Sequence, residues 1–219
     1  SLYYIQGLQT IGFDQLDIKY NRPDKVIRAL DDAFGGGDEE LIKAYHQAWQ
    51  KRVKRLGIDT TSFRDDFSVP ESDFKNRDGL TYEQTDDMLS LHIWGKDSTY
   101  VLDRFNVWVN EVPVLGMRGI QIRDRDLHEI DTVLNIKLSE GENRIETSVL
   151  NVNGTESYRV PLYVHYTPNA PAEHYLYFVG IGIDQYREAG HNLQYSVKDI
   201  RDLASMLRDK YGDKIIIDT

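Results

Sequence analysis

The spacing of apolar residues divides the chain into three parts. In the first part, apolar residues recur at helical intervals over residues 26–30 and again over residues 41–56, with Pro23 in the first turn of the earlier helix and Gly57 after the later one. Proline favours the first turn of a helix, and glycine favours the position that follows its end. Residues 1–75 are therefore predicted to form a small helical connector.

From about residue 76, apolar and polar residues alternate with a period of two, which predicts strands that bury one face. Asn153-Gly154 is a strong signal for a tight hairpin turn, and residues 167–171 have the composition of a linker. Short strands at this spacing are typical of an immunoglobulin-like β-sandwich, so residues 76–168 are predicted to form one. The alternating runs are residues 89–93, 105–109, 132–138, 145–149 and 158–166.

The third part, residues 172–219, has the pattern strand, helix, strand. Residues 175–183 form a continuous apolar run, which is typical of a parallel strand that helices cover on both faces. The helix would begin at Ser196, with Asp199 at the capping-box spacing, and a second apolar strand would begin at residue 214. Two parallel strands need further neighbours. This part is therefore predicted to be a truncated α/β unit, whose open sheet edge could pair with another copy.

Composition narrows the classes of partner. The 219 residues are 40% hydrophobic and 28% charged, with a formal net charge of -10. An acidic chain without clustered positive charge is a poor partner for nucleic acid, and no apolar run approaches the ~20 residues that a membrane span needs. The first residues have neither a basic region nor a cleavage pattern, so no signal peptide is predicted. A cytoplasmic location is favoured, and the compartment is otherwise open.

The chain contains no cysteine, which excludes disulfides, thiolate metal ligands and a thiolate nucleophile. No two histidines have the spacing of a zinc site, and the acidic residues 124–131 lack the glycine of a calcium loop. Gly180 and Gly182 lie inside an apolar run, without the third glycine of a dinucleotide-binding loop. Asn153-Gly154-Thr155 is formally a glycosylation acceptor. No metal and no cofactor are expected.

Several segments resemble one family. The segments YFVGIGIDQY at residues 177–186 and NLQYSVKDIRDL at residues 192–203 resemble the opening of the caspase-like cysteine peptidase domain, in its bacterial, metacaspase-related branch. Four further segments resemble the connector and sandwich that follow a WD-repeat propeller in some bacterial caspase-like proteins. They are FDQLD at 13–17, NRPD at 21–24, DRFNVWVNEVPV at 103–114 and LSEGENRI at 138–145.

This resemblance implies a non-catalytic linker or regulatory region followed by the first strand, helix and strand of a caspase-like cysteine endopeptidase. The whole protein would hydrolyse peptide bonds with a histidine–cysteine dyad that lies beyond residue 219, so the chain itself is not expected to be an enzyme. Asp199 would line the pocket for a basic substrate side chain. Its spacing from Ser196 is also explained by helix capping alone, which is the favoured interpretation.

The alternative hypothesis is a β-sandwich that binds protein or glycan and has no link to proteolysis. Five aromatic residues would form a binding platform if they shared one exposed face, namely Trp94, Trp108, Tyr158, Tyr163 and Tyr166. Aromatic residues at strand spacing more often pack in the core or in cross-strand pairs. Under both hypotheses the expected partner is a protein or a peptide, with glycan as a further ligand class for the sandwich.

Overall fold

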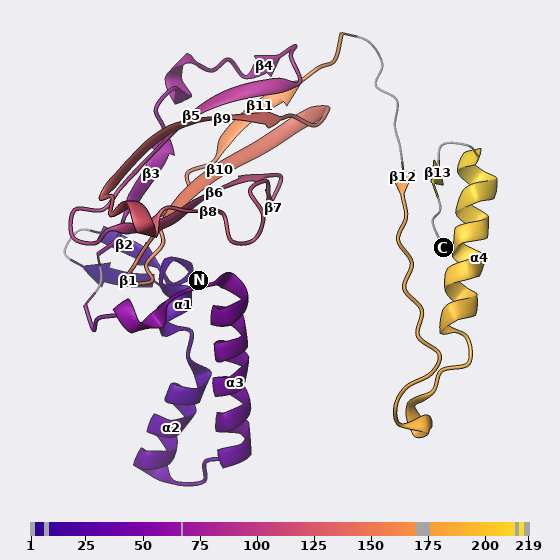
Figure 1. Ribbon diagram of the computed structural model, residues 1–219, viewed down its shortest axis with the longest axis horizontal. Helices are drawn as coiled ribbons and strands as arrows, with labels where there is room; N and C mark the ends of the chain where they lie inside the picture. Colours follow the sequence, from indigo (N-terminus) through magenta and orange to yellow (C-terminus); the bar gives the residue numbers. More distant parts are fainter. Residues whose placement is uncertain (1–2, 7–8, 67, 170–175, 213–214, 217–219) are drawn as a thin grey trace. The chain divides into compact units, whose positions relative to one another are not determined.

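The chain folds into two compact units, Ser1–Asn169 and Ala170–Thr219. The computed structural model describes residues 3–6, 9–66, 68–169, 176–212 and 215–216 (Figure 1). The first unit contains the long helices of the connector as well as both sheets of the sandwich, and the second contains a helix and short strands. The protein is thus a mixed fold of several β-sheets and a few helices.

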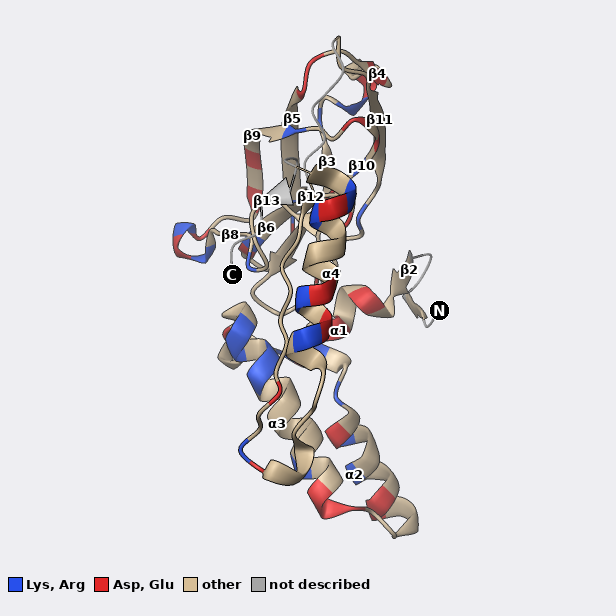
Figure 2. Ribbon diagram, turned by 90° about the vertical axis from the view of Figure 1, so that its right-hand side faces the viewer, with Lys and Arg blue, Asp and Glu red and all other residues tan. Residues whose placement is uncertain are grey.

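The helical elements of the first unit are η1 (Phe13–Leu16), α1 (Asp17–Tyr20), α2 (Pro23–Phe34), α3 (Glu39–Leu56), η2 (Thr60–Ser62), η3 (Arg77–Gly79) and η4 (Arg123–Arg125). The Oδ1 atom of Asp38 caps α3 by accepting hydrogen bonds from the backbone N–H groups of Glu40 and Leu41 at 2.9 and 3.1 Å. Gly57 follows α3 with a φ of 65°, which glycine adopts without strain. Acidic residues open α3 and basic residues close it, as the helix dipole favours (Figure 2).

Two sheets pack face to face in the first unit (Figure 1). The smaller sheet has the antiparallel order β3 (Glu71–Phe74), β5 (Met88–Lys96), β9 (Glu129–Lys137). The larger has the order β4 (Glu83–Gln84), β11 (Leu162–Tyr166), β10 (Gly141–Asn151), β6 (Leu102–Val109), β7 (Val112–Pro113), and β8 (Ile120–Gln121) also pairs with β6. β4 joins β11 in parallel, and the other pairs are antiparallel. This is a β-sandwich, and its first strand precedes residue 76, the predicted start.

The predicted run over residues 158–166 is a strand only from Leu162 onward. Before it, the turn at Asn153-Gly154 leads into a single bridge between Leu150 and Glu156 rather than a regular hairpin. Gly154 has a φ of 81°, and a Cβ atom there would lie 2.6 Å from the ring of Phe63. The turn is therefore shaped by a contact with the connector, which a local sequence pattern does not contain.

An N-terminal hairpin precedes the connector and consists of β1 (Tyr3–Gln6) and β2 (Gln9–Gly12). The turn that follows it is tied to the sandwich, because the side-chain amide of Gln15 donates to the carbonyl of Glu156 at 3.2 Å, and the backbone N–H of Glu156 donates to the carbonyl of Gln15 at 2.8 Å. Leu16, in the same turn, is fully buried.

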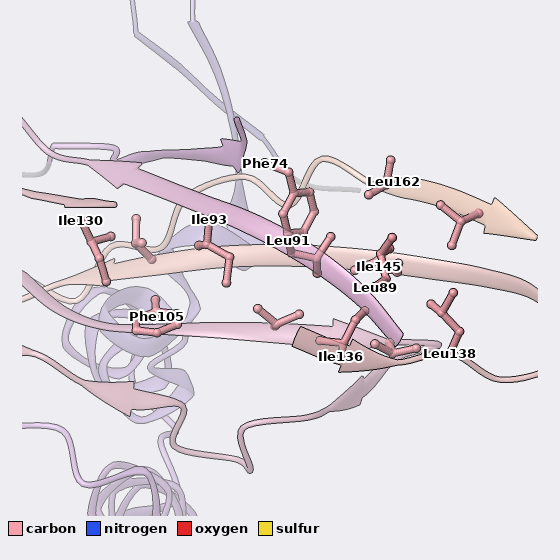
Figure 3. Close-up of a cluster of buried hydrophobic side chains, with 14 of the residues drawn as sticks. Phe74, Leu89, Leu91, Ile93, Phe105, Ile130, Ile136, Leu138, Ile145 and Leu162 are labelled. Carbon is pink, nitrogen blue, oxygen red and sulfur yellow. The ribbon is translucent and has the colours of Figure 1, made fainter. Parts of the chain in front are cut away.

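The core lies between the two sheets and is built from one parity of each strand, except that β6 also contributes Leu102, next to the register shift in its pairing with β10 (Figure 3). On β5 the inward residues are Leu89, Leu91 and Ile93, and Gly95 follows them at the next inward position. A methyl group on Gly95 would overlap the side chain of Val149 on the opposite sheet. The remaining core residues are Phe74, Leu102, Phe105, Val107, Val109, Ile122, Ile130, Ile136, Leu138, Ile145, Leu162 and Val164.

A polar cluster holds α2 against α3. The carboxylate of Asp24 is buried and accepts two hydrogen bonds from Arg22, at 2.8 and 2.6 Å, and lies 3.1 Å from the Nδ1 atom of His46. The guanidinium of Arg22 also stacks over Trp49, 4.0 Å from the ring centroid. Hydrogen bonding from Arg22 holds the pKa of Asp24 well below its usual range. The carboxylate is therefore ionised whenever the connector is folded at neutral pH.

The second unit contains η5 (Ala189–His191), α4 (Ser196–Tyr211) and a parallel pair of short strands, β12 (Leu176–Tyr177) and β13 (Ile215–Ile216). The predicted buried strand over residues 175–183 is wrong, because beyond β12 the described residues are not a strand, and Val179 and Ile181 are 84% and 79% exposed. A buried parallel strand needs paired neighbours and helices on both faces, and a two-residue pair provides neither. Of the predicted second strand, residues 214 and 217–219 lie outside the described residues.

The start of α4 differs from the predicted capping box. Asp184, in the preceding loop, accepts hydrogen bonds from the hydroxyl of Ser196 at 2.8 Å and from the backbone N–H of Val197 at 3.0 Å. Both bonds lower the pKa of Asp184, and the bond from the backbone N–H of Val197 has the larger effect. A box formed by Ser196 and Asp199 is therefore wrong, because a more distant carboxylate already binds the hydroxyl that would have formed it.

We expect Gly95→Ala to lower the free energy of unfolding of the first unit by about 1–3 kcal/mol, because the added methyl overlaps a core side chain. All three tryptophans lie within Ser1–Asn169, so urea unfolding followed by tryptophan fluorescence reports on this unit. Gly79→Ala is the matched control, since a Cβ atom there would meet nothing within 4 Å. Equal unfolding midpoints for the two variants would contradict this packing.

We expect Asp24→Asn to cost about 2 kcal/mol at neutral pH, because it removes the charge that Arg22 binds. A carboxylate with a lowered pKa stabilises the fold fully above its unfolded pKa, which is about 3.9, and loses this contribution as the pH falls through the folded pKa. The difference between wild type and variant should therefore shrink below about pH 4. Asp32→Asn, at an exposed position of α2, serves as the control.

Candidate functional site

The outer face of the larger sheet carries residues that the core alternation leaves outside. On β6, Phe105 and Val107 point into the core, so Arg104, Asn106 and Trp108 point to the outer face. β10 pairs with β6 in antiparallel register, and its outward residues are Arg144, Glu146, Ser148 and Leu150. Charged, polar and apolar side chains therefore meet on one surface.

The end of α3 forms a wall against this face. The guanidinium of Arg104 donates to the carbonyls of Leu56 and Gly57 at 2.6 and 3.0 Å, and that of Arg118 donates to the carbonyl of Arg55 at 2.9 Å. The last carbonyls of a helix have no partner within the helix and carry partial negative charge. Two arginines of the sandwich supply the missing donors, and this contact positions the connector.

A cavity of about 220 Å³ lies between this wall and the sheet. Its apolar lining comes from both parts of the unit, with Ile18, Leu56 and Ile58 from the connector and Met117 and Leu150 from the sandwich. The other lining residues are Arg104, Asn106, Trp108, Arg118, Ser148, Glu156 and Arg159. The surface of the cavity is thus mostly apolar, with several charged and polar side chains in its lining.

Trp108 stands at the border of this cavity. The guanidinium of Arg159 lies over its ring, 3.5 Å from the centroid, and is held there by Glu156, whose Oε1 atom is 2.7 Å away. Ser148 donates a further hydrogen bond to Glu156. A stacked guanidinium fixes the orientation of the indole and occupies one of its faces.

A second, charged cavity of about 420 Å³ shares Trp108 and Arg159 with the first. Arg144 donates to Glu146 at 2.7 Å there, and the Nε atom of Arg144 is buried with no hydrogen-bond partner in the described part of the chain. Asp14, Glu111 and Tyr158 complete its lining. The two cavities together, with every residue that lines either of them, are called the sheet-face trough below.

The structure separates the five aromatic residues of the predicted platform. Trp108 and Tyr158 line the sheet-face trough, and Tyr158 is 63% exposed. Tyr163 lies opposite Arg144 on β11, whereas Tyr166 packs against the core. Trp94 belongs to the smaller sheet, where its indole N–H donates to Glu129 at 2.7 Å. A single five-residue platform is therefore wrong.

Arg144, Glu146, Glu156 and Arg159 were not expected as site residues. The parity rule alone places Arg144 and Glu146 on the outer face, since both alternate with core positions of β10. No comparable signal exists for Arg159, because residues 158–161 are irregular. Its position over Trp108 is a tertiary contact.

Two further predicted sites are the substrate-pocket residue Asp199 and the glycosylation motif at Asn153. Asp199 is exposed in the first turn of α4. Asn153 is fully buried, its Oδ1 atom accepts from Lys19 and from the backbone N–H of Arg64, and its amide donates to Asp66, so the glycosylation motif is inaccessible in the folded chain.

The acidic residues 124–131 do not converge on a cation. Asp131 forms an ion pair with Lys75 and a hydrogen bond with His92, and Asp124 lies in η4. Over the part of the chain that the structure describes, no cluster of three or more His, Cys, Asp or Glu side chains could hold a metal ion. Within the same residues, no helix combines the length and the apolar character that crossing a membrane requires.

No family model and no curated protein sequence matches the chain. Among solved structures, the fibronectin(III)-like modules of Clostridium thermocellum CbhA are 12% identical, with a TM-score of 0.36, over 50% of this chain and 54% of that chain. A chitin binding domain from Burkholderia pseudomallei is 13% identical, with a TM-score of 0.27, over 43% of this chain and 61% of that chain. The chain thus spans little more than half the length of these structures.

These findings correct the family expectation. The two structures named above are fibronectin(III)-like modules and a chitin binding domain, not caspase-like peptidases, and no family model matches. The resemblance to WD-repeat-linked caspase-like proteins is therefore wrong, as is the expectation of a region serving proteolysis. The first unit does contain the β-sandwich that the alternative hypothesis names.

We expect Arg104→Met to lower the free energy of unfolding by about 1–3 kcal/mol, because the carbonyls of Leu56 and Gly57 lose charged hydrogen bonds. Hydrogen exchange should become faster over residues 53–58, which form this wall of the cavity. Arg125→Met, at an exposed position in η4, is the control. Unchanged exchange at the end of α3 would contradict the proposed positioning of the connector.

Proposed function

We propose that this chain is a β-sandwich binding module that holds an extended segment of another protein in the sheet-face trough. The observation that carries the proposal is the apolar cavity of about 220 Å³ beside Trp108, built jointly by the connector and the outer face of the larger sheet. Ligand sites are concave and mostly apolar, with a few polar groups that fix orientation. A bulky apolar side chain of the ligand would occupy this cavity.

The lining favours a protein segment over a glycan. A sugar ring stacks on an open aromatic face, whereas one face of Trp108 already carries the guanidinium of Arg159. The walls of the cavity come from aliphatic residues such as Ile18, Leu56 and Ile58. This aliphatic part of the lining suits a Leu, Ile, Met or Phe side chain of a ligand, and a sugar hydroxyl placed against it would lose its hydrogen bonds to water.

The charged cavity next to it would bind the main chain or a polar side chain of the same segment. Arg144 lines this cavity with a side chain that is 41% exposed, and a ligand carbonyl or carboxylate would accept hydrogen bonds from its guanidinium. Glu146 lies beside Arg144, so backbone N–H groups of the ligand also find an acceptor there. Because the connector supplies one wall, the binding unit is Ser1–Asn169 rather than the sandwich alone.

The test is selection of peptides from a random display library on the full chain, followed by fluorescence polarisation with the selected peptides. We expect the selected sequences to share one large apolar residue, and Trp108→Ala to weaken their binding at least about tenfold, as central interface tryptophans do. Trp94→Ala is the matched control, because Trp94 is a partly exposed tryptophan of the other sheet. Circular dichroism confirms that both variants fold.

Two results would contradict this function. The first is peptide binding that Trp94→Ala and Trp108→Ala weaken equally, since the ligand would then not lie in the trough. The second is a glycan array that yields ligands dependent on Trp108, while no peptide is selected. That result would assign the same surface to sugars.

A further inference from the structure

One strand of the sandwich has a long open side. β9 is at the end of the order β3-β5-β9, and it comprises nine residues in unbroken register with β5 (Figures 1 and 2). The other sheet ends are short: β7 and β4 have two residues each, and β7 ends in Pro113. β3 has four residues and follows Pro70. Exposed edges are usually short or interrupted, because a regular edge can pair with another strand.

The backbone of β9 alternates between its two sides. Leu138 and His128, just beyond the two ends of β9, bond to the β5 side: the N–H of Leu138 donates to Asp87 at 2.7 Å, and the carbonyl of His128 accepts from Asp97 at 2.9 Å. In an antiparallel pair every second residue forms these bonds. Even-numbered residues of β9 therefore bind β5. The N–H and C=O groups of residues 129, 131, 133, 135 and 137 point to the open side.

The side chains of these odd-numbered residues match each other when two β9 strands pair in antiparallel fashion with Val133 at the centre. In an antiparallel pair of two β9 strands centred on Val133, Glu129 of one copy lies opposite Lys137 of the other. Asp131 then lies opposite Asn135, and Val133, which is 61% exposed, lies opposite its own counterpart. Opposite charges in directly opposed positions stabilise a strand pair.

We propose that a second copy of this chain pairs through β9, with a two-fold axis at Val133. The two smaller sheets would then form one continuous six-stranded sheet, and about ten backbone hydrogen bonds would join residues of the odd set. A two-fold interface requires a self-complementary surface, and β9 has one in its backbone and in its side chains. This interface lies on the other sheet from the trough and is also distinct from the sheet edge predicted in residues 172–219.

The charged residues favour the register centred on Val133 over registers shifted by one residue. A shift that centres the pair on Thr132 or Leu134 keeps odd residues opposite odd residues, but it moves Glu129 and Lys137 out of opposition. The assembly also closes at two copies, because the outer edges of the joined sheet would be the two β3 strands, each short and preceded by Pro70. A closed dimer is therefore expected rather than a fibre.

Neighbours within one copy already order the charged side chains. Trp94 donates to Glu129, and the carboxylate of Asp131 is held by Lys75 and His92. Side chains that are fixed before association lose less rotamer freedom when the copies meet. Lys137 is held less closely, by an ion pair to Asp87 at 3.6 Å, and its side chain is largely exposed.

The test is sedimentation velocity of the full chain from about 1 to about 200 µM, the range in which an interface of one strand pair is expected to associate. We expect a monomer–dimer equilibrium that Val133→Pro weakens at least about tenfold, because proline removes the donor at the two-fold axis. The N–H of Val133 does not face β5, so no bond within the copy is lost. Val133→Thr keeps the N–H and the branched side chain, and it should retain the dimer.

Charge variants test the register. Lys137→Glu places two carboxylates opposite each other and should weaken the dimer, whereas the double variant with Glu129→Lys should restore it. Lys51→Glu, on the exposed face of α3, makes the same change of net charge elsewhere and should have no effect. Hydrogen exchange of the wild type should show protection of Asp131, Val133 and Asn135 that rises with protein concentration.

A monomer at all concentrations would overturn the proposal, even if an added peptide paired with β9. A dimer that Val133→Pro and Lys137→Glu both leave unchanged would overturn it too, since another surface would then join the copies. Neither result bears on peptide binding at Trp108, so this proposal and the proposed function can fail separately.

Discussion

Burial of one parity of each strand between the two sheets is the interaction on which the rest of the first unit depends. Because side chains of a strand alternate between its faces, placing Phe105 and Val107 in the core leaves Arg104 and Trp108 outside. The sheet-face trough is therefore a consequence of the core and needs no separate folding signal. The same alternation sets which groups of β9 face its open side.

The connector is held by a different kind of contact. A guanidinium that is largely buried needs several acceptors, and the last carbonyls of a helix need donors. Arg104 meets both needs by binding the carbonyls of Leu56 and Gly57. The apolar cavity exists because this polar contact keeps the end of α3 beside the sheet without filling the space in between.

The second unit contains an apolar run that lacks the neighbouring strands and covered faces of the sandwich strands. Val179 and Ile181 belong to a run as apolar as the core strands, yet they are exposed and irregular. A strand is stabilised by neighbouring strands and by covered faces, and β12 pairs over only two residues. The likeness of this segment to a peptidase domain rested on local sequence, and local sequence did not specify its packing.

The sequence by itself determined the helices at residues 23–34 and 39–56, the longer antiparallel strands β5, β6, β9, β10 and β11 and the alternation of their core positions, because apolar spacing and end signals are local. Tertiary structure alone decided that Arg159 stacks on Trp108, that Asp184 caps α4, that the connector walls a cavity and that β9 is the open edge. Each of these joins residues far apart in the chain or depends on strand order. Neither a distance between segments nor the order of strands is encoded in the pattern of neighbouring residues.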